Sequence, residues 1–157
     1  MNSCYSTRTL KKSPGVLEKE TQCSCPKILI VDDNPFNIMA FETILNSLEV
    51  KRESVYNGKE AIDKRMERVN ETCGENCKGY KVIFMDQEMP GMSGSETVRE
   101  ITRLQELNLL PEMKIIGCTA HGTKEEIENF MESGTDECIQ KPISLNKIKE
   151  LLDGFLV

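Results

Sequence analysis

The sequence contains no tryptophan, one histidine and only 5% aromatic residues. It also lacks a long apolar run: a helix that crosses a bilayer needs about 18 consecutive apolar residues, and no stretch of this chain approaches that length. The polar segment from Met1 to Thr9 lacks the apolar run of a secretion signal. These absences predict a cytoplasmic protein without membrane insertion.

The chain has no excess of basic residues either. Lysine and arginine total 20 against 26 aspartate and glutamate residues, which gives a net charge of −6. Binding to nucleic acid requires clustered lysine and arginine side chains that neutralise phosphates, so we expect no direct contact with nucleic acid. With 38% hydrophobic residues in a length of 157, the chain can form the core of one globular domain.

The first 26 residues differ from the rest of the chain. They show no apolar period and carry four basic and two acidic residues, so their charge is +2 and that of residues 27–157 is −8. We therefore expect a flexible tail at 1–26 and one folded domain at 27–157.

From residue 27 onward, short apolar runs alternate with helical periods. Continuous apolar runs between polar residues are typical of strands buried on both faces. They occur at 28–31, 82–85 and 113–116, with weaker strand patterns at 50–56 and 137–140. This order of elements predicts parallel strands with right-handed crossovers, hence a doubly wound α/β sheet.

Five helical periods lie between and after these strands. They follow Pro35 and Asn57, surround Val98, and follow Thr123 and Ser144. The second is expected to carry Ala61, Ile62, Met66 and Val69, and the last to bury Ile148, Leu151, Leu152 and Phe155. Thr123 with Glu126 predicts a capping box, and Gly134 a helix end.

Polar side chains stand where the expected strands end. Asp32 and Asp33 follow the first strand, Asp86 the third, Thr119 the fourth and Lys141 the fifth. In such sheets, ligands bind outside the carboxyl ends of the strands. Three carboxylates that converge there repel one another unless a cation lies among them. An oxygen-rich site with room for water and phosphate favours Mg²⁺, which suits phosphoryl transfer to a carboxylate.

These segments together resemble the response-regulator receiver domains of two-component phosphorelay systems. The resemblance extends from about Lys27 to Phe155, and it is carried by four segments: Ile28 to Asn34, Phe84 to Gly94, Cys118 to Ala120, and Gln140 to Ile143. Asn34, Asn37 and the Lys-Pro-Ile sequence resemble receivers attached to hybrid histidine kinases. The family implies a flavodoxin-like (βα)5 fold with strand order 2-1-3-4-5.

The resemblance also implies a role for each residue at the strand ends. Asp86 matches the phospho-acceptor, and Asp32 and Asp33 match the acidic pair that binds Mg²⁺ together with Asp86 and the backbone carbonyl of Glu88. Thr119 matches the switch hydroxyl and Lys141 the family's lysine. The implied phosphoryl donor is a histidine kinase or a histidine phosphotransfer protein, and the domain is not expected to be an enzyme toward other substrates.

One position departs from the family pattern. The family usually has an aromatic residue three positions before the lysine, where this chain has Cys138. Either output coupling uses backbone movement of the 119–124 loop instead, or Cys138 is a small buried residue in a domain that only passes the phosphoryl group on. Glu88 and His121 match positions that tune the lifetime of the acyl phosphate, and His121 is interpreted as a tuning or solvent-exposed residue.

Cysteine is frequent in this chain. Its seven cysteines are an odd number without a secretion signal, which is typical of free thiols in a reducing compartment. Cys23 and Cys25 precede the first strand, and Cys73 and Cys77 precede the third. Because those strands are neighbours in the family order, the two pairs can meet and bind structural Zn²⁺. The spacings are not those of a two-residue knuckle, however, and the segment 70–79 is alternatively a flexible insertion.

Two other functions remain open from the sequence. An aspartate-nucleophile phosphatase of the haloacid dehalogenase type uses similar residues, but its nucleophile follows the first strand. An interaction module with a silent site would bind no Mg²⁺ and accept no phosphoryl group.

Overall fold

A computed structural model describes residues 23–71, 73–74, 77 and 79–153. Most of the predicted tail, 1–26, and the predicted core residue Phe155 therefore lie outside the described residues. The last part of that tail packs onto the domain, because Cys25 is only 3% exposed. Within the described residues, no helix is long and apolar enough to cross a membrane.

Five strands form one parallel sheet in the order β2-β1-β3-β4-β5. The strands are β1 (Ile28–Val31), β2 (Arg52–Val55), β3 (Val82–Asp86), β4 (Lys114–Thr119) and β5 (Glu137–Gln140). The helices are α1 (Pro35–Ser47), α2 (Gly58–Asn70), α3 (Gly94–Glu106), α4 (Lys124–Glu132) and α5 (Leu145–Leu152). The predicted doubly wound α/β fold and the implied strand order are confirmed.

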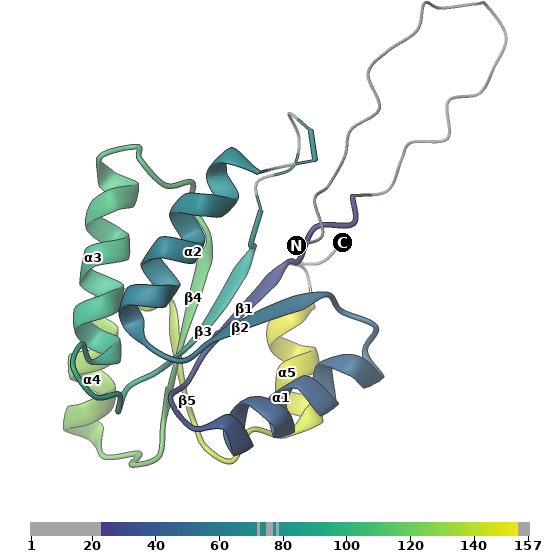
Figure 1. The fold of residues 1–157 in the computed structure, drawn as a ribbon. Coiled ribbons are helices and arrows are strands. Elements are labelled where there is room, and N and C mark those ends of the chain that lie inside the picture. Colours follow the sequence, from purple (N-terminus) through teal and green to yellow (C-terminus); the bar gives the residue numbers. More distant parts are fainter. Residues whose placement is uncertain (1–22, 72, 75–76, 78, 154–157) are drawn as a thin grey trace, which may run out of the picture.

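Helices cover both faces of the sheet. Helices α1 and α5 lie on one face, and α2, α3 and α4 lie on the other (Figure 1). The side chains of β1 alternate accordingly: Ile28 and Ile30 pack toward α1 and α5, whereas Leu29 and Val31 pack toward α2 and α3. Apolar residues therefore occupy every position of this strand, which is the pattern of a parallel strand buried on both faces.

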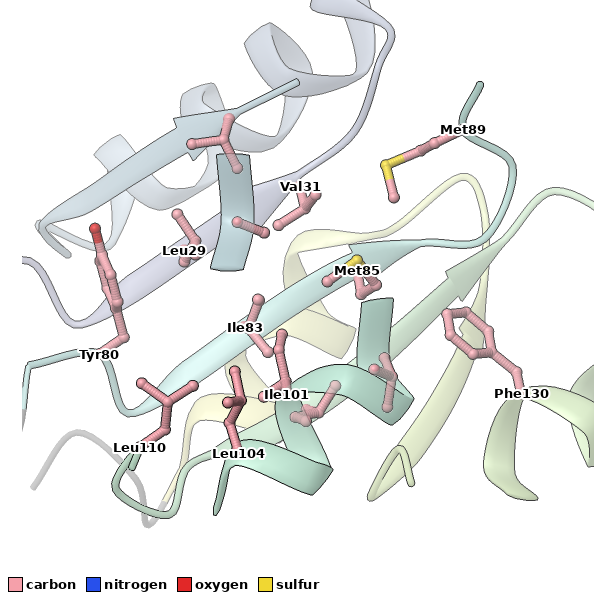
Figure 2. Packing of buried hydrophobic residues seen from close by; sticks show 14 residues of the cluster. Leu29, Val31, Tyr80, Ile83, Met85, Met89, Ile101, Leu104, Leu110 and Phe130 are labelled. Atoms are coloured by element: carbon pink, nitrogen blue, oxygen red, sulfur yellow. The ribbon is translucent and has the colours of Figure 1, made fainter. Parts of the chain in front are cut away.

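One hydrophobic cluster lies between the sheet and the three helices α2, α3 and α4 (Figure 2). Ile83 and Met85 of β3 lie at its centre, and Phe130 of α4 closes one end. Phe130 packs directly on β4 at Gly117, where an added Cβ would lie 2.7 Å from the aromatic ring. Glycine in this buried strand thus makes room for the helix that covers it.

All five helices begin at a residue whose side chain accepts a hydrogen bond from the first turn: Asn34, Asn57, Ser93, Thr123 and Ser144. The cap at Thr123 is confirmed, but Glu126 accepts from the Thr123 hydroxyl at 2.8 Å, and the full capping box is found at Ser93 instead. Gly134 has a φ of +115°, which confirms the predicted helix end.

The apolar pattern expected for α2 is partly wrong. Met66 and Val69 are 40% and 39% exposed, whereas Arg65 is 1% exposed. The Arg65 guanidinium donates to the carbonyl of Pro111 at 2.8 Å. A long side chain that reaches a backbone acceptor below the helix therefore replaces the apolar contact, and hydropathy alone could not indicate this.

Candidate functional site

Parallel pairing aligns the ends of the strands that carry the predicted site. Val31, the last residue of β1, lies opposite Met85, and Thr119, the last residue of β4, lies opposite Gln140. Asp86 ends β3. The residues at or directly after these strand ends consequently meet at one edge of the sheet, as predicted from the sequence.

Lys141 connects two of the predicted carboxylates. Its Nζ lies 2.6 Å from Asp32 Oδ2 and 2.7 Å from Asp86 Oδ1. The two acidic side chains are 7% exposed, and that of Lys141 is 20% exposed. Alternation places all three on the side of the sheet covered by α1 and α5, because their neighbours two residues back, Ile30, Phe84 and Ile139, belong to that hydrophobic cluster.

The surroundings of Asp86 and Lys141 shift the pKa values of both groups. Burial raises the pKa of Asp86 above the ordinary value of a carboxyl group, although Lys141 acts in the opposite direction. The pKa of Lys141 is raised, because hydrogen bonds to Asp32 and Asp86 outweigh the effect of burial. At neutral pH the lysine is therefore a firmly charged partner of both carboxylates.

The donor set of the site fits a hard divalent cation. Asp32, Asp33 and Asp86 each offer a carboxylate oxygen, and these oxygens lie within 4.8 Å of one another. Three carboxylates and one ammonium leave a charge of −2, which favours the binding of a further cation. Asp33 is exposed, which leaves one side open to water and to a phosphoryl group.

Thr119 lies at the same edge of the sheet, but its side chain is on the other face from those of Asp86 and Lys141. Its hydroxyl donates to the backbone carbonyl of His121 at 2.9 Å and accepts from the backbone N–H of His121 at 3.2 Å. The side chain is buried, with 2% exposure of the residue. The backbone N–H of Lys141 donates to the Thr119 carbonyl at 2.8 Å, so Thr119 lies beside the site with its hydroxyl engaged by the loop that follows it.

Glu88 and His121 connect the two loops beside the site. Glu88 belongs to the β3–α3 connection, His121 to the β4–α4 connection, and Nδ1 of His121 lies 2.8 Å from Oε1 of Glu88. Both side chains are well exposed. The pair therefore joins the two loops at the surface and is open to solvent, as expected for His121.

Cys138 lies within β5, opposite Gly117 of β4. Its side chain is partly buried and packs against the hydrophobic cluster beneath α2, α3 and α4. Burial raises the pKa of this thiol. The structure thus places a small, partly buried residue at the position that is usually aromatic, and its effect on signalling stays a prediction.

Two residues near the site were not predicted as part of it. Nδ2 of Asn37, in the first turn of α1, donates to both carboxylate oxygens of Asp32 at 3.2 and 3.1 Å. Oε1 of Gln87 accepts from the backbone N–H and the hydroxyl of Ser95 at 2.9 and 2.8 Å. A polar residue in the first turn after an acidic pair was a usable signal for Asn37, whereas the Gln87 contact depends on a turn of the chain that only the fold reveals.

Gly94 lets α3 begin directly against the acceptor strand. An added Cβ at this position would lie 2.2 Å from the backbone oxygen of Asp86. The backbone N–H of Gly94 donates to the carbonyl of Gln87 at 3.0 Å. The end of β3 is therefore held by the first turn of α3, a close approach that only glycine allows.

Comparison with known proteins agrees with this geometry. The family model described as the response regulator receiver domain matches residues 28–153. The chain is 34% identical over 129 residues to hybrid signal transduction histidine kinase L of Dictyostelium discoideum, covering 82% of this chain and 7% of that kinase. It is also 34% identical over 126 residues to two-component response regulator 24 of Arabidopsis thaliana, covering 79% of each protein.

Solved structures show the same fold. The receiver domain of a sensor histidine kinase from Pseudomonas aeruginosa, with a magnesium ion in its active-site cleft, has a TM-score of 0.69 and 25% identity, covering 84% of this chain and 98% of that one. The receiver domain of Ssk1 from Saccharomyces cerevisiae, solved with the histidine phosphotransfer protein Ypd1, has a TM-score of 0.70 and 23% identity, covering 83% and 88%. The chain belongs to the family of response regulator receiver domains.

Proposed function

We propose that this chain is a phosphorelay receiver that accepts a phosphoryl group from a phosphohistidine onto Asp86 in a Mg²⁺-dependent reaction and then signals or relays it. One observation carries the proposal: Lys141 contacts Asp32 and Asp86 together at the carboxyl edge of the sheet, with Asp33 within reach of both. Such a site holds a nucleophile, a cation and a metal-binding acidic pair in one place.

The metal ligands in this proposal are the carboxylates of Asp32, Asp33 and Asp86 and the backbone carbonyl of Glu88. Bound Mg²⁺ would neutralise charge that develops on the phosphoryl oxygens. Asn37 supports this arrangement, because its two hydrogen bonds fix the orientation of the Asp32 carboxylate.

Asp86 acts as the nucleophile. One of its carboxylate oxygens attacks phosphorus, the P–N bond of the phosphohistidine breaks, and the bonding electron pair stays on the donor's imidazole nitrogen. The ammonium of Lys141, which already lies 2.7 Å from Asp86 Oδ1, stabilises the charge of the transferring group. The product is an acyl phosphate on Asp86.

Thr119 reports the new group. Its hydroxyl donates to the His121 carbonyl in the structure. A phosphoryl group on Asp86 would offer this hydroxyl a stronger, charged acceptor. Exchange of one acceptor for the other would release the loop that begins at His121. The signal therefore passes through this loop, as Cys138 cannot rotate as an aromatic side chain does.

The donor is a histidine kinase or a histidine phosphotransfer protein, and we propose that it docks beside α1. Phe36 and Met39 on this helix are 74% and 56% exposed, and Asn37 between them contacts the site. Apolar side chains exposed around a reactive group are typical of a protein-docking surface. The co-crystal of Ypd1 with the Ssk1 receiver, which has the same fold, supports this class of partner.

We further propose that the chain acts in the cytoplasm and modifies only itself. The six described cysteines are unpaired, as in a reducing compartment. One carboxylate that receives one phosphoryl group predicts a single modification per chain. A phosphatase with the same residues would instead turn over many substrate molecules.

The test is phosphotransfer from a purified phosphohistidine protein to the full chain. With Mg²⁺ present, we expect one phosphoryl group per chain, no labelling of Asp86→Asn, and normal labelling of the control Asp63→Asn, whose carboxylate lies on the surface of α2. Equal labelling of Asp86→Asn would refute the assignment. Multiple turnover on a small phosphomonoester would favour the phosphatase, and no Mg²⁺ binding would favour the silent module.

A further inference from the structure

Four cysteines gather at the other end of the sheet from the acidic site. Cys23 and Cys25 lie before β1, and Cys73 and Cys77 lie in the connection from α2 to β3. Their sulfur atoms all lie within 4.8 Å of one another. We name these four residues the cysteine cluster. Its two halves are about fifty positions apart in the chain, so only the fold brings them together.

The spacing of the sulfurs is close to that of a tetrahedral metal site. A zinc–sulfur bond of about 2.3 Å in tetrahedral geometry places the sulfurs about 3.8 Å apart. Cys23 Sγ lies 3.3 Å from Cys77 Sγ and 3.1 Å from Cys73 Sγ. These two distances are shorter than the tetrahedral value and no pair of sulfurs is more than 4.8 Å apart, so shifts of about 1 Å or less complete the geometry.

A positive charge and hydrogen-bond donors lie beside the sulfurs of Cys23 and Cys77. Nζ of Lys27 lies 3.1 Å from Cys23 Sγ and 3.7 Å from Cys77 Sγ. The backbone N–H groups of Cys25 and Gly79 face the sulfurs of Cys23 and Cys77, respectively. Four thiolates around a divalent ion carry a net charge of −2, which the Lys27 ammonium partly offsets. Such surrounding donors are typical of metal sites in proteins.

We propose that the cysteine cluster binds one structural Zn²⁺. On binding, four Zn–S bonds form, and each cysteine that was a thiol releases its proton to solvent. Four soft sulfur ligands select zinc over magnesium, and a complete set of four protein ligands leaves no open position for catalysis. Cys23 and Cys73 are exposed and Cys25 and Cys77 are buried, so the ion enters from the side of the first two.

The ion would fasten the segment before β1 to the segment before β3. These strands are neighbours, and the backbone N–H of Lys81 already donates to the carbonyl of Lys27 at 2.8 Å beside the cluster. Because the four sulfurs meet only in the folded chain, the free energy of zinc binding adds to the stability of the fold. Because parallel strands place their amino and carboxyl ends at opposite edges, this site does not touch Asp86 or its Mg²⁺ ligands.

The first test is the metal content of the full chain, purified under reducing conditions without added zinc. We expect one zinc per chain in the wild type and in the control Cys138→Ser, and loss of at least nine-tenths of it in the double variant Cys23→Ser/Cys73→Ser, since both replaced thiols are exposed and a serine hydroxyl binds zinc poorly. Removal of zinc with a selective chelator should lower the melting temperature by about 5 °C or more, while labelling of Asp86 in Mg²⁺ continues.

A second measurement on the wild type does not depend on how the variant folds. Replacement of zinc by Co²⁺ should give the intense absorption of tetrahedral cobalt with thiolate ligands. The proposal is overturned if the reduced wild type binds no zinc even when it is supplied, if the double variant retains zinc, if the native ion is iron, or if the purified chain holds disulfides instead. Loss of phosphorylation in every sample, with zinc present, would instead count against the function proposed for Asp86.

Discussion

Removal of the ammonium of Lys141 should lower the stability of the domain, and Mg²⁺ should restore it. At an effective dielectric constant near 20, the Lys141 contacts at 2.6 and 2.7 Å are each worth about 6 kcal/mol of attraction. The carboxylate oxygens of Asp32, Asp33 and Asp86 lie within 4.8 Å, so each of the three pairs repels by about 3.5 kcal/mol or more. Attraction and repulsion therefore nearly cancel in the wild-type site.

In Lys141→Met the repulsion of about 10 kcal/mol is no longer offset. Protonation and water will relieve part of it, so we expect the free energy of unfolding at neutral pH in EDTA to fall by about 3–5 kcal/mol, as when one member of a buried ion pair is removed. Mg²⁺ should restore most of this loss. The affinity for Mg²⁺ should rise at least about tenfold, because relief of only about 1.4 kcal/mol of cation–cation repulsion has that effect.

The pH dependence has a defined sign. The pKa of Asp86 is already raised by burial in the wild type, and loss of the ammonium raises it further. The folded state then binds a proton more readily than the unfolded state, so stability increases as the pH is lowered from neutral through the folded-state pKa. The loss of stability in Lys141→Met is fully present above that pKa and decreases as Asp86 is protonated.

The assay is urea unfolding at several pH values, with EDTA or with saturating Mg²⁺. The control is Lys147→Met, which removes an ammonium that pairs with the carboxylates of Glu137 and Glu150 at the surface and should change the stability little. If Lys141→Met loses no more stability than this control, or if Mg²⁺ stabilises both variants equally, the account of the site's charge balance is wrong.

Three further changes give distinct results. Arg65→Met should leave the urea midpoint unchanged or raise it, because a buried charge that is incompletely hydrogen-bonded is costly. Burial lowers the pKa of Arg65 to about 10, and its Nε has no hydrogen-bond partner among the described residues. A large loss of stability would contradict this. Phe36→Ala should slow transfer from a phosphohistidine protein but not labelling by acetyl phosphate, whereas Leu107→Ala, 54% exposed after α3, should change neither; equal slowing by both would refute docking at α1. His121→Ala should shorten the acyl-phosphate lifetime in a dephosphorylation assay, because it breaks the contact with Glu88 that joins the two loops beside the site; an unchanged lifetime would remove this role.

Several elements could be predicted because their signals are local. β1 and β5 have the predicted bounds, and the cap at Asn57 lies where its sequence indicated. Apolar runs and capping side chains act over a few residues, so they are visible before folding. The apolar pattern of α2 was misleading, because Arg65 reaches the distant carbonyl of Pro111, and no local signal contains that partner.

The candidate site shows the same division. The residue types and their order after the strands predicted which side chains would meet, since parallel strands place their carboxyl ends at one edge. The sequence did not indicate that Lys141 would contact Asp32 and Asp86 while Thr119 contacts the backbone of His121. That outcome depends on strand register and on which face each side chain occupies.

By itself, the sequence determined the alternation of strands and helices, the parallel sheet, the acidic composition of one edge and hence the need for a cation there. The tertiary structure decided which carboxylates Lys141 holds, where Asn37 supports Asp32, and that the four cysteines of the cysteine cluster lie within 4.8 Å. The physical reason is the range of the interactions: hydropathy and capping act along the chain, whereas charge balance and metal geometry depend on distances between segments that are remote in sequence.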